Sequence, residues 1–164
     1  MSKRVTQAVI LAGGLGTRLK PFTNTKPKPM YPINNVPFID YLIRQMKDFG
    51  MEEVLLLLGY LPEKIMDYLG DRSRYDLTIN YDITPVDYDT GMRIKHAAPQ
   101  IADTFLLLYC DNYCPINYLK LFSDFCNNKA KIQITVYSNR DNYTKNNLHI
   151  TDDGLVTTYD KKRI

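Results

Sequence analysis

The sequence of 164 residues has no apolar run that approaches the length of a membrane span. A transmembrane helix requires about 20 consecutive apolar residues. The N-terminus (Ser2, Lys3, Arg4) also lacks the hydrophobic region of a signal peptide. We therefore expect a cytoplasmic protein that has no membrane partner.

Cysteine and histidine are scarce. Cys110, Cys114 and Cys126 form an odd set, so they do not make a complete disulfide framework. Cys110 and Cys114 also lack the second Cys or His pair of a zinc site, because the two histidines, His96 and His149, stand alone. We interpret the cysteines as buried, reduced thiols in a reducing compartment.

The charge is low and scattered. The net charge is +3, and Lys161, Lys162 and Arg163 supply much of it. Basic residues are not gathered into a long stripe with interleaved aromatics, so we expect no nucleic-acid partner. Length and an apolar content of 45% are ordinary for a globular protein and favour a single domain over 1–164.

Apolar runs of strand length alternate with helical patterns along the chain. Two of these runs, 54–58 and 105–109, are continuously apolar, which suits strands buried on both faces of a parallel sheet. The strand–helix–strand repetition predicts an α/β fold with a mostly parallel central sheet and helices on both faces. The predicted strands are 7–11, 53–58, 77–81, 104–109 and 131–137, and the predicted helices are 37–49, 62–69, 91–98 and 115–127.

Three further segments complete this organisation. The stretch 21–37 contains five prolines and is expected to be an ordered loop that crosses the ligand site. Residues 148–159 predict a hairpin with Asp153-Gly154 as its turn, and helix 115–127 is expected to turn Ile116, Leu119, Phe122 and Cys126 inward. The chain ends at Ile164 without a closing helix, so we expect a domain truncated on its C-terminal side; a dimer that completes the sheet is an alternative.

The most informative segment is a glycine-rich loop that follows the first predicted strand. Gly13, Gly14 and Gly16 allow the backbone to approach a bulky ligand, and their successive N–H groups form an anion-binding concavity. Four cations lie within the next residues, at Arg18, Lys20, Lys26 and Lys28. Such groups beside exposed amides favour a nucleoside triphosphate as the ligand.

Two common phosphate loops do not fit this segment. A Walker A loop requires Gly-Lys-Ser or Gly-Lys-Thr, whereas Gly16 is followed by Thr17 and Arg18. A dinucleotide fingerprint requires a third glycine, where Leu19 stands, and an acidic residue after the second strand, where the chain reads Gly59-Tyr60. A dinucleotide-dependent oxidoreductase is therefore disfavoured.

The segment resembles the signature of the sugar-1-phosphate nucleotidyltransferases, and the similarity extends over essentially the whole chain. The matching residues are Leu11, Ala12, Gly13, Gly14, Gly16, Thr17, Arg18, Leu19, Pro21, Thr23, Lys26, Pro27, Lys28, Pro29, Met30 and Pro32. This resemblance implies a Rossmann-like, glycosyltransferase-A-like sandwich. It also implies an enzyme that joins a nucleoside triphosphate to a sugar 1-phosphate and releases pyrophosphate.

The resemblance implies roles for the residues of the nucleotide site. Arg18 would grip the β- and γ-phosphates, and Lys28 would lie near the reacting phosphorus, as the two catalytic residues. The other nucleotide-binding residues are expected at Leu11, Ala12, Gly13, Gly14, Gly16, Thr17, Thr90 and Gly91. Asp89 and Met92 replace glycines of the family's Gly-Thr-Gly-Gly turn, which puts base contacts there in doubt.

Two aspartates carry the remaining implied roles. Asp111, in a Cys-Asp-Asn run that resembles the family's Gly-Asp-Asn, would hold a nucleotide-bound Mg²⁺. Asp160 and Lys161 resemble the family's element that binds the sugar phosphate. A second metal-binding aspartate of the family has no candidate here and would lie beyond residue 164, so the chain alone is expected to bind nucleotide and to transfer poorly.

Several short segments resemble the heptose-1-phosphate guanylyltransferase branch, which favours GTP and a heptose- or hexose-type sugar for cell-surface glycans. They are 58–62, 84–86, 109–113 and 159–161. Some members of this branch carry a phosphatase domain after the transferase. A non-catalytic regulatory homologue that binds a nucleotide or nucleotide sugar is the alternative, and the base, the sugar and a homo-oligomeric state stay open.

Overall fold

The computed structural model describes residues 4–70, 75–128 and 130–160. It contains two compact units, Met1–Lys129 and Ala130–Ile164. The single nucleotidyltransferase domain over 1–164 stays a prediction.

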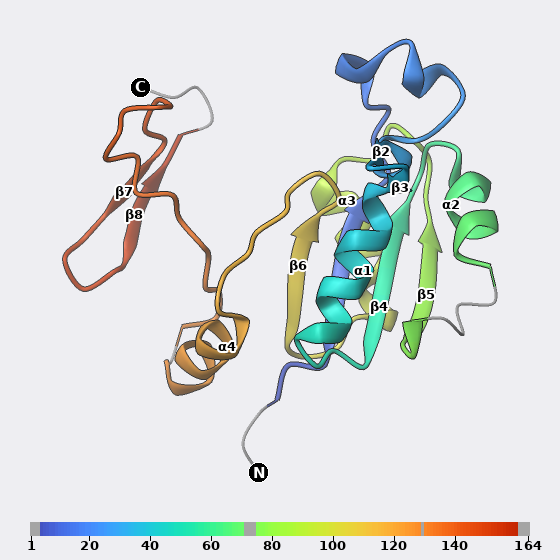
Figure 1. Cartoon of the computed structure of the whole chain (residues 1–164). Coiled ribbons are helices and arrows are strands. Elements are labelled where there is room, and N and C mark those ends of the chain that lie inside the picture. The colour runs from blue at the N-terminus through green and yellow to red at the C-terminus, as the bar shows by residue number, and fades with distance from the viewer. Residues whose placement is uncertain (1–3, 71–74, 129, 161–164) are drawn as a thin grey trace. The chain divides into compact units, whose positions relative to one another are not determined.

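The first unit is built on a four-stranded parallel sheet in the order β5-β4-β1-β6 (Figure 1). Its strands are β1 (Gln7–Ala12), β4 (Glu53–Leu58), β5 (Thr78–Ile83) and β6 (Phe105–Tyr109). The strands end in register, because Ala12 pairs with Leu58 and Leu58 with Ile83. The four strands predicted here and the parallel sheet are confirmed.

Helices cover both faces of this sheet, as predicted. Alternate residues of the two central strands, β1 and β4, enter opposite cores, so the apolar run 54–58 is buried on both sides as predicted. The same prediction is wrong for the run 105–109, because β6 lies at an edge of the described sheet and Leu107 and Tyr109 are exposed. One core contains residues of α1 (Phe38–Asp48), α2 (Pro62–Leu69) and α4 (Tyr118–Asn127), and the other contains α3 (Thr90–Ala97). No helix in the described parts of the chain is long and apolar enough to cross a membrane.

Proline and glycine set the ends of the helices over this sheet. Pro37 precedes α1, and Gly50, with a φ of 75°, follows it. Pro62 opens α2, and Gly70, with a φ of 57°, caps it. A proline loses no intrahelical hydrogen bond in the first turn, and glycine adopts a positive φ at little cost, so both predicted helices form within these limits.

The proline-rich segment 21–37 forms short turns and two two-residue strands, without a regular helix, as expected. They are η2 (Phe22–Asn24), η3 (Lys28–Met30), β2 (Pro32–Ile33) and β3 (Val36–Pro37), and the turn η1 (Thr17–Leu19) precedes them. Another turn, η5 (Ala98–Gln100), follows α3. Figure 1 shows the 17–31 segment folded above the carboxyl ends of the strands.

The predicted inward face of helix 115–127 is confirmed for Ile116 and Phe122, which pack against the core, but it is wrong for Leu119 and Cys126. Leu119 is 71% exposed and Cys126 is exposed, whereas Tyr118 is buried. The Tyr118 ring packs on Phe49 with ring centroids 4.2 Å apart. A tyrosine ring buries more apolar surface than a leucine, so its packing fixes the rotation of the helix. The expectation of buried cysteines is also wrong for Cys126. Cys110 is buried, and Cys114 is partly buried.

The second unit contains the predicted hairpin, but one predicted strand is missing. Strands β7 (Leu148–Ile150) and β8 (Val156–Tyr159) pair antiparallel, and Gly154 has a φ of 85° in the turn. Residues 131–137 are not a strand. Their alternating residues, such as Ile132 at 79% exposed, have the period of a strand, but no described strand pairs with them.

A buried carboxylate ties α1 to the elements beside it. Asp40 is 2% exposed and accepts hydrogen bonds from Tyr75 Oη at 2.6 Å and Tyr68 Oη at 3.3 Å. Arg44 Nε donates to it at 2.5 Å, one helical turn along α1. Because Tyr68 belongs to α2 and Tyr75 precedes β5, one carboxylate connects three segments.

We predict that Asp40→Asn lowers the free energy of unfolding by about 2–3 kcal/mol, because an amide cannot accept from all these donors. Urea unfolding measures this change. The matched control is Asp124→Asn, which breaks the exposed i,i+4 pair with Lys120 and should cost about 0.5 kcal/mol or less. Equal losses in both variants would contradict the role given to Asp40.

Candidate functional site

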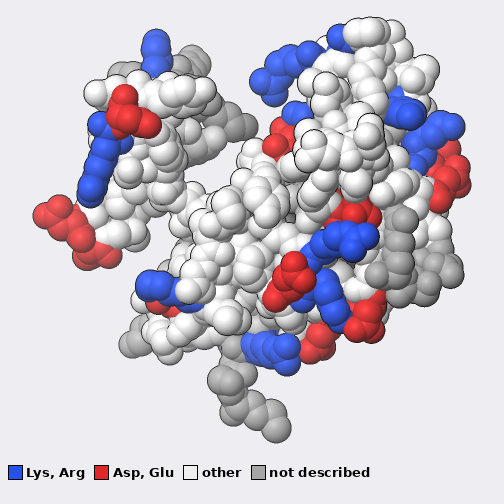
Figure 2. All heavy atoms as spheres, in the orientation of Figure 1, with Lys and Arg blue, Asp and Glu red and all other residues white. Residues whose placement is uncertain are grey.

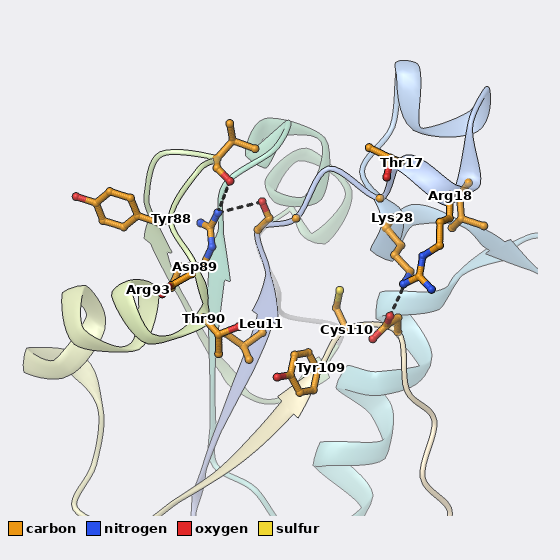
Figure 3. Close-up of a pocket in the computed structure, with 16 residues that line it drawn as sticks. Leu11, Thr17, Arg18, Lys28, Tyr88, Asp89, Thr90, Arg93, Tyr109 and Cys110 are labelled. Carbon is orange, nitrogen blue, oxygen red and sulfur yellow. Dashed lines mark hydrogen bonds and ion pairs between the residues drawn. The ribbon is translucent and has the colours of Figure 1, made fainter. Parts of the chain in front are cut away.

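A pocket lies where the chain leaves the carboxyl ends of the strands. Its volume is about 430 Å³, within the usual range for small-molecule sites. Ligands of open α/β sheets bind at this edge. The lining residues, drawn in Figure 3, are Leu11, Gly13, Gly14, Gly16, Thr17, Arg18, Leu19, Lys28, Val86, Tyr88, Asp89, Thr90, Arg93, Tyr109, Cys110 and Asp111.

The glycine loop wraps around one side of the pocket. Gly16 has φ 63° and ψ 33°, a left-handed conformation that favours glycine. A Cβ on Gly16 would also lie 3.0 Å from both Lys28 Cβ and Thr23 Cγ2. The Thr23 hydroxyl holds this turn by donating to Gly16 O at 3.1 Å. The loop is thus fixed by the proline-rich segment, which places Lys28 next to it.

Two of the predicted cations face the pocket, and they differ in their partners. Lys28 Nζ lies 2.5 Å from Asp111 Oδ2, and both side chains are only partly exposed. Arg18 is exposed and has no carboxylate partner among the described residues. On the α1 face in Figure 2, by contrast, basic side chains lie beside acidic ones, and Lys47 pairs with Asp76 there. Arg18 is therefore available to an anionic ligand.

Asp111 is the carboxylate in the pocket that suits a magnesium ion. It follows β6 directly, so the strand carries it to the edge where the glycine loop lies. The described residues contain no group of three or more His, Cys, Asp and Glu side chains that could hold a metal. Mg²⁺ usually binds through one or two carboxylates plus phosphate oxygens and water, so a single carboxylate fits a nucleotide-bound ion.

The predicted turn around Thr90 is the first turn of α3. Asp89 is the N-cap, and its side chain accepts a hydrogen bond from Met92 N at 2.8 Å. Thr90 lines the pocket, whereas Gly91 does not. Aspartate is among the best N-cap residues. Capping of α3 therefore explains why Asp89 can replace a glycine of the family turn.

Cys110, which replaces a glycine of the family run, lines the pocket beside Asp111. The side chain is buried, and burial raises the pKa of its thiol to about 12. The nearby Asp111 charge raises this pKa further, whereas Lys28 lowers it. Cys110 is therefore a neutral thiol at physiological pH and a wall of the pocket, not a nucleophile.

The structure brings most of the predicted site residues into this one pocket. They are Leu11, Gly13, Gly14, Gly16, Thr17, Arg18, Lys28, Thr90 and Asp111. Ala12 does not line it, because its side chain is part of the core beneath the sheet. Asp160 belongs to the second unit, and Lys161 lies outside the described residues, so their sugar-phosphate roles stay predictions.

Sequence reasoning missed Arg93. It lies on α3 and is 4% exposed, and its guanidinium reaches the carbonyl groups beside the pocket. The one sequence signal is its spacing of four residues from the buried Ala97, which places both on the inward face of the helix. That signal does not distinguish a buried arginine from a solvated one.

Comparison with known proteins shows the family of this chain. The family model for nucleotidyl transferases matches residues 7–154. The chain is 32% identical over 156 residues to the D-glycero-alpha-D-manno-heptose 1-phosphate guanylyltransferase of Campylobacter jejuni, covering 95% of this chain and 68% of that protein. It is 31% identical over 177 residues to the probable glucose-1-phosphate cytidylyltransferase of Bacillus subtilis, with the same two coverages.

A solved structure extends the agreement to the fold. The crystal structure of HddC from Yersinia pseudotuberculosis complexed with GMP-PN matches with a TM-score of 0.67 and 33% identity. The match covers 75% of this chain and 55% of HddC, so the chain spans little more than half of that protein. It spans about two thirds of the curated relatives. The chain belongs to the nucleotidyl transferase family of enzymes.

Proposed function

We propose that the pocket binds a nucleoside triphosphate, whose nucleoside monophosphate is transferred to a sugar 1-phosphate. The products are a nucleoside diphosphate sugar and pyrophosphate. One observation carries this proposal: the glycine loop, the exposed Arg18 and the Lys28–Asp111 pair all face the same pocket. Backbone amides and cations recognise phosphates, and a carboxylate beside them suits the accompanying metal ion.

The transfer is a direct displacement in this proposal. A phosphate oxygen of the sugar 1-phosphate attacks the α-phosphorus in line. The bond from the α-phosphorus to the bridging oxygen breaks, and pyrophosphate leaves with that electron pair. The attacking group is already an anion, so a general base is unnecessary, and the protein contributes positioning and electrostatics.

The side chains divide the electrostatic work. Arg18 neutralises the charge that develops on the leaving pyrophosphate, and Lys28 stabilises the oxygens around the α-phosphorus. A Mg²⁺ ion, when bound, neutralises phosphate charge and orients the phosphates. Asp111 supplies the carboxylate that holds it. Lys28 pairs with the Asp111 carboxylate, so Lys28 would turn to the phosphates if Asp111 held a metal ion.

We further propose GTP as the nucleotide and a heptose- or hexose-type 1-phosphate as the acceptor, in the synthesis of cell-surface glycan precursors. The relatives named above include a heptose 1-phosphate guanylyltransferase and a protein crystallised with GMP-PN, which support this choice. The probable cytidylyltransferase at similar identity is the reason to test every base. The cytoplasmic location, a homo-oligomer and a fused phosphatase domain stay predictions.

Nucleotide binding is tested first by isothermal titration with GTP, CTP, UTP, dTTP and ATP, each with Mg²⁺. We expect one nucleotide to bind selectively, and Arg18→Ala to raise its Kd at least about tenfold, which is about 1.4 kcal/mol. Lys20→Ala is the matched control, because Lys20 is exposed nearby and does not line the pocket. Equal affinities of wild type and Arg18→Ala would refute the role of Arg18.

We predict that Asp111→Asn strengthens nucleotide binding without Mg²⁺ and weakens the effect of Mg²⁺ on binding. With EDTA, the variant should bind the nucleotide more tightly than wild type, because Lys28 loses its carboxylate partner and the repulsion between Asp111 and phosphate disappears. With Mg²⁺, the variant should lose most of the gain in affinity that the metal gives wild type. Titrations in both buffers measure this.

The exposed Asp103→Asn is the control for that titration, since Asp103 does not line the pocket. If an Asp111 variant keeps the full dependence on magnesium, Asp111 does not hold the metal.

Selective nucleotide binding, together with release of pyrophosphate when a sugar 1-phosphate is added, distinguishes the enzyme from a regulatory protein that only binds the nucleotide.

A further inference from the structure

We propose that Arg93 is a positioning residue that holds the three loops around the nucleotide pocket in their binding conformation. This inference rests on the proposed function, because it assumes that the pocket binds a nucleotide. Arg93 acts through the backbone of the loops and leaves the phosphates to Arg18 and Lys28.

The guanidinium of Arg93 donates hydrogen bonds to the ends of three strands at once. Its Nη1 reaches Leu58 O at 3.0 Å and the hydroxyl of Thr84, at the ends of β4 and β5. Its Nη2 reaches Gly13 O at 3.2 Å, at the end of β1, and Pro85 O and Val86 O at 3.0 Å each. Figure 3 shows the guanidinium between the glycine loop and the loop that leads to α3.

This arrangement needs an arginine. The guanidinium has five N–H donors in a rigid plane, so it can join acceptors on separate loops at fixed relative positions. A lysine ammonium has three donors on a flexible stem. Arg93 is 4% exposed, so each carbonyl group would lose one hydrogen bond away from bulk water without it.

The bond to Gly13 O orients an amide of the glycine loop. In a trans peptide the carbonyl and the following N–H point in opposite directions. The cis bond of the described residues is Lys20–Pro21, so the Gly13–Gly14 peptide is trans. Because Gly13 O is held by Arg93 and by Tyr60 N at 3.2 Å, the Gly14 N–H points away from them. Arg93 thereby fixes one donor of the predicted anion-binding loop.

Two glycines make room for the guanidinium. A Cβ on Gly13 would collide with the Arg93 guanidinium, and a Cβ on Gly59 would lie 2.6 Å from Arg93 Nη1 and from Gly13 O. The signature glycine at 13 is therefore needed for close packing inside the protein as well as for approach of a ligand. Five hydrogen bonds hold the guanidinium, so it cannot move aside cheaply.

The charge of Arg93 also favours an anionic ligand in the pocket. No described carboxylate lies within hydrogen-bonding distance of the guanidinium, which is bound by neutral oxygens. Burial lowers the pKa of Arg93, and the charges of Asp87 and Asp82 raise it. An arginine stays protonated in proteins, so the wall of the pocket carries a fixed positive charge that favours an anionic ligand.

Arg93→Lys tests the proposal, with Arg44→Lys as the matched control. Arg44 pairs with Asp40 on α1, away from the pocket, so the same chemical change there should lower stability without changing nucleotide affinity. We expect Arg93→Lys to raise the nucleotide Kd about tenfold. In the ligand-free protein, amide hydrogen exchange at residues 13–16 and at Tyr60 should accelerate more than exchange in β4.

A double-mutant cycle keeps the test independent of folding losses. Gly13→Ala should weaken nucleotide binding in the wild type because the guanidinium is fixed. In an Arg93→Ala background, where the collision is gone, the same substitution should have a clearly smaller effect. Additive effects, or an Arg93→Lys variant that binds and exchanges like Arg44→Lys, would overturn the proposal.

The experiments distinguish failure of the proposed nucleotide binding from failure of the proposed role of Arg93. If the wild type binds none of the five nucleotides, the proposed function fails, yet the exchange measurement in the free protein still tests whether Arg93 holds the loop. If the wild type binds a nucleotide and Arg93→Lys leaves both affinity and exchange unchanged, the function stands and Arg93 is not a positioning residue.

Discussion

The common direction of four strands is the constraint on which the rest of the first unit depends. Because β1, β4, β5 and β6 are parallel and end in register, the segments that follow them meet at one edge of the sheet. Each segment brings a different chemical group: the glycine loop after β1, Gly59 after β4, Thr84 after β5 and Asp111 after β6. The glycine loop and Asp111, about a hundred positions apart, thus line one pocket, whereas Gly59 and Thr84 contact Arg93 beside it.

The positive charges at this edge have three different environments, and each environment suits a different task. Arg18 is exposed and has no described carboxylate partner, so it can bind an anion directly. Lys28 is paired with Asp111 at the pocket, so a carboxylate offsets its charge. Arg93 is buried and bound to backbone oxygens, so it gives shape and a fixed charge to the wall.

The local elements of the first unit were predictable because their signals are local. The continuous apolar run 54–58 predicted the central strand β4, and the proline before and the glycine after each helix predicted the limits of α1 and α2. Predictions failed where a partner decides the outcome. Residues 131–137 have the period of a strand but no described strand to pair with, and α4 follows the packing of Tyr118 rather than the pattern of its aliphatic residues.

The sequence by itself determined the glycine loop, the cations beside it and the aspartate after β6, because phosphate and metal chemistry limits which residue types can stand there. Tertiary structure decided which of these groups meet. It paired Lys28 with Asp111, kept Ala12 in the core and brought Arg93 against Gly13. The contact between Arg93 and Gly13 joins residues 80 positions apart, and only the packing of α3 against the sheet brings them together.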